Sequence, residues 1–137
     1  MQWLKAQSYA TKLTFEDVQE MLRRPSGCTI LSTLPPSEQG YLLPGTTMPG
    51  AEEARMNHLL AGSGKTTEQI IVYGKNACDN LPYRRYKQLA SLGFKRVGIY
   101  AGGLLEWALL QDVYGSDLFP SKGVCDDILA FRGTRRL

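Results

Sequence analysis

Apolar and polar positions alternate along the chain in blocks that predict helices and strands in turn. From Thr14 onward, apolar residues follow at helical spacing, and Asp17 lies three residues beyond Thr14, an arrangement close to a capping box. We expect this helix to end before Pro25. The short apolar and β-branched run over residues 28–31 then predicts a buried strand, and a long loop rich in proline and glycine follows it.

The remaining blocks continue this alternation. Good helix formers fill residues 51–60, and QIIVY at residues 69–73 is the strongest strand signal in the chain. We expect a helix from near Pro82 to Gly93, a strand over residues 95–100 and a helix over residues 104–115. Such a succession is typical of an α/β fold, in which helices cover both faces of a mostly parallel central sheet.

Length and composition indicate a single domain. The chain has 137 residues, 43% of them hydrophobic, which is sufficient for one buried core. The alternating pattern spans about residues 13–115. Residues 116–137 are expected to form a C-terminal extension, with a short apolar stretch at 128–131 that packs back on the core before the chain frays.

Charge narrows the classes of partner. The 16 basic and 13 acidic residues leave a net charge of +3, which is too small and too scattered to indicate a nucleic-acid or membrane partner. No stretch approaches the length of an apolar membrane span, and the N-terminus lacks the pattern of a secretory signal. We therefore expect a cytoplasmic protein.

The cysteines and the single histidine show no metal-binding pattern. Cys28, Cys78 and Cys125 are widely separated and lack CxxC spacing, which argues against a disulfide framework and against a zinc site. His58 lies in the expected helix 51–60 and is interpreted as an ordinary helix residue. We expect neither a metal nor any other cofactor.

One segment resembles part of a phosphate-binding P-loop. It is Gly62-Ser63-Gly64-Lys65-Thr66, but the glycine that a P-loop needs five residues before Gly64 is replaced by Leu59. A P-loop also follows a strand and begins a helix, whereas here the helix comes first and the strand second. We interpret the segment as a flexible connection and exclude nucleotide hydrolysis.

The polar loop after the strand at 69–73 is the candidate site. It lies between the strongest strand and the helix that begins near Pro82, where open α/β sheets bind their ligands. Its backbone amides and the amino end of that helix are expected to converge on one point and to suit an anion. The candidate residues are Gly74, Lys75, Asn76, Ala77, Cys78 and Asp79.

The sequence around this loop resembles the rhodanese domain, a sulfur-transferring family. The segment QIIVYGKNACDN, a helix and then SLGFKRVGIYAGGLLEW are similar to the second half of that domain, and the resemblance covers about residues 13–115. It implies a rhodanese-like fold. The matching positions are Tyr73, Leu89, Gly93, Phe94, Val97, Tyr100, Gly102, Gly103 and Trp107, together with residues 43–46, which are similar to the family's Ile-Pro-Gly-Ala.

This sequence lacks the family's catalytic residues at the positions where the resemblance would place them. Active members place a cysteine directly after this strand, where it carries sulfur as a persulfide, and often an arginine five residues later; this sequence has Gly74 and Asp79 there. Glycine offers no nucleophile, and Asp79 adds negative charge where an anion would sit. Likewise, residues 32–34 (Ser-Thr-Leu) replace the family's Asp-Val-Arg, and residues 41–42 (Tyr-Leu) replace its Gly-His.

These replacements favour a non-catalytic rhodanese-like module that binds a protein partner or a small anion through the loop. The alternative is a divergent sulfurtransferase or thiol-redox protein that uses Cys78, because Lys75 and the following helix end would lower the pKa of a thiol placed there. A dual-specificity phosphatase with a related fold would need the cysteine and the arginine of a Cys-x5-Arg loop, and this loop contains neither at the required positions. The arginines near the end of the chain, Arg132, Arg135 and Arg136, raise a third possibility, which is contact with nucleic acid or with an acidic surface, although a solvated terminus is the more ordinary explanation.

Overall fold

A four-stranded parallel sheet forms the centre of the protein. The computed structural model describes residues 10–137. Across the sheet the order is β1 (Thr11–Leu13), β5 (Val97–Tyr100), β4 (Gln69–Tyr73) and β2 (Cys28–Ser32), and every neighbouring pair is parallel. The two central strands, β4 and β5, are buried apart from the first residue of β4, which explains why their sequences are continuously apolar.

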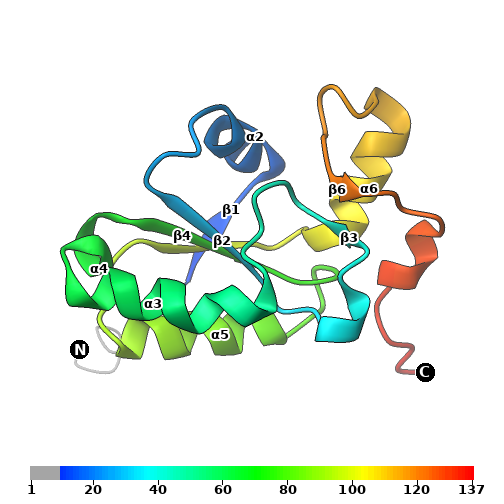
Figure 1. The fold of residues 1–137 in the computed structure, drawn as a ribbon. Coiled ribbons are helices and arrows are strands. Elements are labelled where there is room, and N and C mark those ends of the chain that lie inside the picture. Colours follow the sequence, from blue (N-terminus) through cyan, green and yellow to red (C-terminus); the bar gives the residue numbers. More distant parts are fainter. Residues whose placement is uncertain (1–9) are drawn as a thin grey trace, which may run out of the picture.

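Helices cover both faces of this sheet, as predicted (Figure 1). On one face, α2 (Phe15–Arg23) and α6 (Gly103–Tyr114) share a hydrophobic core with the sheet; on the other, α3 (Glu52–Ala61) and α5 (Leu81–Ser91) share a second core. Figure 1 shows α2 above the sheet and α3 with α5 below it. The buried apolar side chains of each helix therefore face the strands. Helix α6 also exposes Leu109, Val113 and Tyr114.

The capping box expected at the start of the first helix is present. The Thr14 backbone N–H donates to Asp17 Oδ2 at 2.8 Å, and the Asp17 N–H donates back to Thr14 Oγ1 at 3.3 Å. The shorter acid thus closes the same reciprocal arrangement as glutamate. The helix ends at Arg23, before Pro25, as the sequence predicts.

Short or atypical elements differ from the sequence expectation. Strand β1 was not expected, because three residues with a single half-buried side chain give no periodic signal. The P-loop-like segment is α4 (Gly64–Thr67), a one-turn helix in place of the flexible connection. Strand β5 begins at Val97, two residues later than predicted.

A small antiparallel pair ties the C-terminal extension to the core. It consists of β3 (Tyr41–Leu42) and β6 (Lys122–Gly123), in strands too short to give a pattern. The extension continues into a 3-10 helix, Ile128–Phe131, in which Phe131 is buried against Tyr41 with ring centroids 5.6 Å apart. The extension therefore packs back on the core, as predicted.

A buried polar network closes the amino end of β4. Glu68, which is 8% exposed, accepts hydrogen bonds from Thr29 Oγ1 at 2.6 Å and from the Arg55 guanidinium at 2.8 Å. Arg55 Nε also donates to Thr29 Oγ1 at 3.2 Å. The carboxylate thus has a cation and a hydroxyl as partners, which a buried charge requires.

Candidate functional site

The loop from Gly74 to Asn80 connects the carboxyl end of β4 to α5. Its backbone is fixed by α6, because the Leu104 and Leu105 N–H groups donate to the carbonyls of Gly74 and Lys75 at 3.0 and 2.8 Å. Gly103 makes this approach close: its φ is +65°, and a Cβ on it would lie 2.7 Å from Gly74 O. The second glycine of the Gly-Gly pair is thus needed to dock the loop on the helix.

Asp79 occupies the space that a side chain at position 74 would need. Its carboxylate accepts the Lys75 N–H at 3.2 Å and the Leu81 N–H at 3.0 Å. A Cβ on Gly74 would overlap Asp79 Oδ2 and would lie 2.9 Å from Pro82 Cγ. The loop therefore contains its own anion, and two of the amides that the sequence suggested for an external anion are engaged by it.

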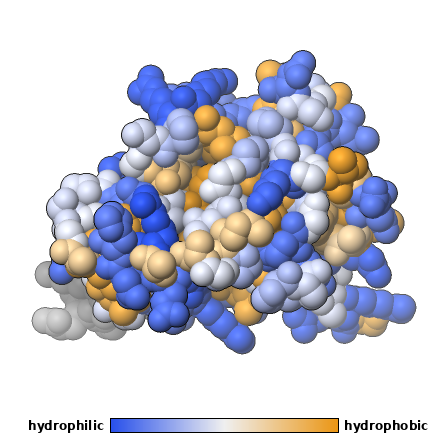
Figure 2. Space-filling view, in the orientation of Figure 1, coloured by the Kyte–Doolittle hydropathy of each residue, from blue (hydrophilic) through white to orange (hydrophobic). Residues whose placement is uncertain are grey.

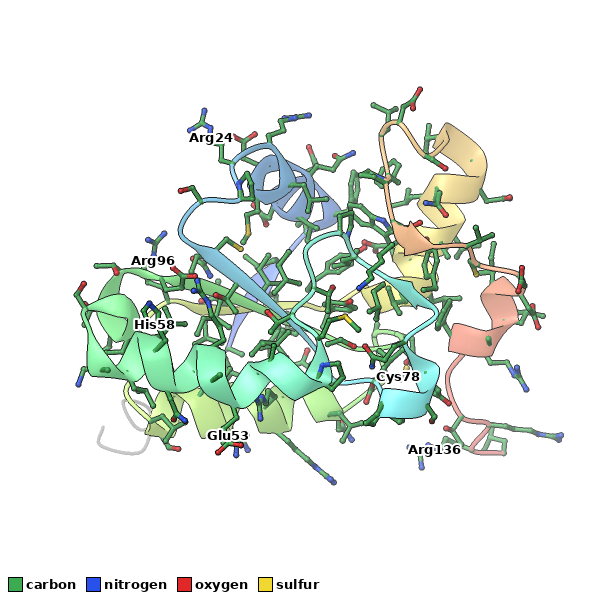
Figure 3. All side chains as sticks on the ribbon, in the orientation of Figure 1. Arg24, Glu53, His58, Cys78, Arg96 and Arg136 are labelled. Carbon is green, nitrogen blue, oxygen red and sulfur yellow. The ribbon has the colours of Figure 1, made fainter. Side chains whose placement is uncertain are left out.

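Asn76 links the loop to the C-terminal extension. Its Oδ1 accepts the Cys78 N–H at 2.8 Å, while its Nδ2 donates to Phe131 O at 2.9 Å. A Cβ on Gly133 would lie 3.8 Å from the Cys78 Cβ, so the chain end passes beside this cysteine. Figure 3 likewise shows Cys78 on the side of the molecule where the C-terminal segment and Arg136 lie.

A pocket of about 410 Å³ opens between the loop and the C-terminal segment. Cys78 is exposed and lines it, and the Lys75 ammonium, also part of the lining, pairs with Glu38 at 2.7 Å. The sequence located one wall of this pocket but missed the other, which was expected to fray. Sequence reasoning named Arg132 and Arg136 only for a contact with nucleic acid or an acidic surface and did not name Thr134, and all three residues line this pocket.

Other chemically notable side chains lie away from the loop. Burial, assisted by the charge of Glu68, raises the pKa of the Cys28 thiol to about 11, so it stays protonated at neutral pH. Cys125 lies in the extension, where burial raises its thiol pKa. His58 is exposed on α3, remote from Cys78 in Figure 3. Among residues 10–137 no three His, Cys, Asp or Glu side chains gather to hold a metal.

Tyr73 and Trp107 are structural. The Tyr73 hydroxyl accepts the Leu43 N–H at 3.1 Å and contacts Thr46 Oγ1 at 2.7 Å, and burial raises its pKa to about 12. It therefore holds the loop 43–46 against the sheet. Trp107 is fully buried, and its indole N–H donates to Pro120 O at 2.9 Å, which anchors the start of the extension.

The sequence predicts no membrane-spanning segment, and the lengths of the helices can be compared with this expectation. Within the described part of the chain, no helix has both the length and the apolar character required to cross a bilayer. The longest, α6, has 12 residues. Figure 2 shows hydrophobic residues mainly in the centre of one face, between α2 and α3, with a largely hydrophilic lower edge.

The parallel sheet, the helices on both faces and the loop after β4 make the fold rhodanese-like. The structure is similar to the rhodanese-like domain of the Alr3790 protein from Anabaena sp., with 22% identity over 94% of this chain and 95% of that chain, at a TM-score of 0.58. It is also similar to a thiosulfate sulfurtransferase from Pseudomonas aeruginosa, with 24% identity over 73% of this chain and 19% of that chain, again at 0.58.

A third similar structure, the BH2092 protein from Bacillus halodurans, shares 20% identity over 89% of this chain and 82% of that chain, at a TM-score of 0.60. No protein-family model matches the sequence, and no curated protein matches it significantly. At this level of identity the structural likeness establishes the fold. The function has to be argued from the loop and its surroundings.

Proposed function

We propose that this protein is a non-catalytic rhodanese-like module that binds a protein partner or a small anion at the surface around the Gly74–Asp79 loop. The observation that carries the proposal is the position of the Asp79 carboxylate beside Gly74. It fills the space in which an active member would hold its thiol, and it takes the Lys75 and Leu81 amides.

Both consequences oppose sulfur transfer at this position. Gly74 supplies no nucleophile that could form a persulfide. Its surroundings also leave no space for a cysteine side chain, because Asp79 and Pro82 occupy it. The Asp79 carboxylate also repels an incoming thiosulfate dianion. Its negative charge is not neutralised by an ion pair within residues 10–137.

What the site retains is a pocket for binding. The opening between the loop and the C-terminal segment includes Arg132 and Arg136 besides Lys75, which is paired with Glu38, and its lining has the single acidic residue Asp79. This charge excess suits a carboxylate or phosphate group on a ligand. We place the protein in the cytoplasm, since its three cysteines are free thiols.

A second candidate function is supported by Cys78. This thiol is exposed and lines the same pocket as Lys75 and the two arginines. In that case the Cys78 thiolate would attack the outer sulfur of thiosulfate, form a persulfide and release sulfite. A second acceptor thiol or cyanide would then remove the outer sulfur and return the thiolate.

A thiosulfate:cyanide sulfurtransferase assay separates the two functions. We expect the wild-type chain and Cys78→Ser to show the same background rate, beside a catalytically active rhodanese as positive control. Intact-mass measurement after thiosulfate treatment should show no added sulfur atom. Turnover that disappears in Cys78→Ser, together with a persulfide on Cys78, would overturn the non-catalytic function.

A further inference from the structure

The pocket beside the loop adjoins a second hollow, and we consider the two together as one groove. The second hollow, of about 600 Å³, lies over the start of α5. Both share Thr33, Leu34 and Leu81 in their lining. The groove therefore runs from the C-terminal segment, past the loop, to the region between α3 and α5.

The middle of this groove is apolar. Leu34, which is buried, and Leu81 lie at the junction of the two hollows, with Pro35 on one side and Pro36 and Pro49 on the other. Leu81 is 44% exposed although it begins a helix in the core. Burial of an exposed apolar side chain of this kind against a ligand is favourable, at about 25 cal/mol per Å².

Both ends of the groove are positively charged. Arg132 and Arg136 line one end, and Arg84 and Arg85 line the other. Arg85 pairs with Glu52 at 3.4 Å. In contrast, Arg84, Arg132 and Arg136 have no carboxylate partner within residues 10–137.

The two acidic side chains in the lining do not compensate this charge. Asp79 is held by backbone amides, and Glu52 is paired with Arg85. Three cationic side chains thus remain for a ligand, at two ends separated by an apolar middle. A ligand that uses the cationic groups of both ends must therefore extend past the apolar middle.

We propose that this groove binds an acidic, extended segment of a partner protein, with carboxylates at Arg132 and Arg136 and at Arg84, and an apolar side chain against Leu81 and the exposed Pro35 and Pro36. This inference rests on the proposed binding function and identifies its partner class. Charge complementarity supports a peptide, and the absence of any aromatic side chain from the lining opposes single-stranded nucleic acid, which stacks its bases on such rings.

The test is a selection from a displayed library of random short peptides on the immobilised full-length chain. We expect the enriched sequences to carry Asp or Glu on both sides of a central apolar residue. The best peptide, labelled with fluorescein, should bind the Arg132→Glu/Arg136→Glu variant about tenfold more weakly and Arg84→Glu about threefold more weakly by fluorescence polarisation.

The matched control is Arg24→Glu, the same charge reversal on an exposed arginine at the end of α2, which lies far from Cys78 and Arg136 in Figure 3. It should leave the affinity unchanged. Enriched peptides without acidic residues, equal binding by the double variant, or tighter binding of a single-stranded oligothymidylate than of the peptide would overturn the proposal. Circular dichroism spectra establish that each variant is folded.

The sulfurtransferase assay remains independent of this selection. Turnover lost in Cys78→Ser would overturn the non-catalytic function, while arginine-dependent peptide binding would still support the groove. Conversely, peptides whose binding does not depend on the arginines would overturn the proposed groove without bearing on the non-catalytic function.

Discussion

A carboxylate lies near each end of strand β4, and the two carboxylates are stabilised by different partners. At the amino end, Glu68 is buried and paired with the Arg55 guanidinium and the Thr29 hydroxyl. At the carboxyl end, Asp79 is held by two backbone amides and has no cationic partner among the described residues. The first arrangement stabilises the fold, and the second uses groups that could equally hold an external anion.

A cysteine also lies near each end of β4, and the two cysteines differ in their exposure to solvent. Cys28 begins β2 near Glu68 and is partly buried, whereas Cys78 is exposed beside the pocket. The comparison teaches that a carboxylate near a strand end is not evidence of a site by itself. Its partners decide whether it belongs to the scaffold or to a surface that binds ligands.

The largest effect is expected from breaking the network at the amino end. Arg55→Leu leaves the buried Glu68 carboxylate with the Thr29 hydroxyl alone and should lower the free energy of unfolding by about 2 kcal/mol, a value reduced because the guanidinium is partly exposed. Urea denaturation measures this. Arg24→Leu, which removes an exposed pair with Glu20, is the control and should change stability little. If Arg55→Leu lowered the free energy of unfolding no more than Arg24→Leu does, Glu68 would have to be solvated.

At the carboxyl end, Gly74→Ala should cost about 2 kcal/mol, because the new methyl overlaps the Asp79 carboxylate and crowds Pro82. In an Asp79→Ala background the same change should cost about 1 kcal/mol, since the principal overlap is removed. A double-mutant cycle by urea denaturation measures this coupling. Additive effects would mean that Asp79 does not occupy the space beside Gly74.

A third comparison concerns the amides that Asp79 occupies. In Asp79→Ala the Lys75 and Leu81 amides lose their anion, so sulfate at a few times its dissociation constant should stabilise this variant by about 1 kcal/mol more than wild type. Thermal unfolding in matched sulfate and chloride solutions measures the difference. Because sulfate stabilises most proteins in general, only the excess over wild type counts. No excess would contradict the role of Asp79 as an internal anion.

The smallest perturbation is chemical labelling, which leaves the native fold in place. With iodoacetamide at pH 8, Cys78 should react first and Cys28 last, because a pKa of about 11 gives Cys28 about a hundredfold less thiolate than a thiol at 9.0. Peptide mass spectrometry measures the order. Comparable rates at the two cysteines would contradict the burial of Cys28.

The same pKa shift predicts the direction of a pH effect on stability. The unfolded chain loses the Cys28 proton at a lower pH than the folded chain. The free energy of unfolding should therefore fall as the pH rises from about 9 towards 11. Cys28→Ala should flatten this part of the curve, and an unchanged slope would assign it to other groups.

The sequence by itself determined the α/β class, the parallel core strands and the position of the candidate loop. The strand at 69–73 carries a continuous apolar pattern because four of its five residues are buried. The sequence also identified the joint replacement at Gly74 and Asp79, since this follows from residue identity alone.

Only the tertiary structure decided how these two residues fit together and what forms the rest of the groove. The overlap between Gly74 and the Asp79 carboxylate depends on the course of the loop, which α6 fixes through Gly103. The arginines at 132 and 136 face the pocket because Phe131 is buried and Asn76 binds its carbonyl, contacts that join positions 55 residues apart. Such long-range contacts leave no periodic trace in the sequence.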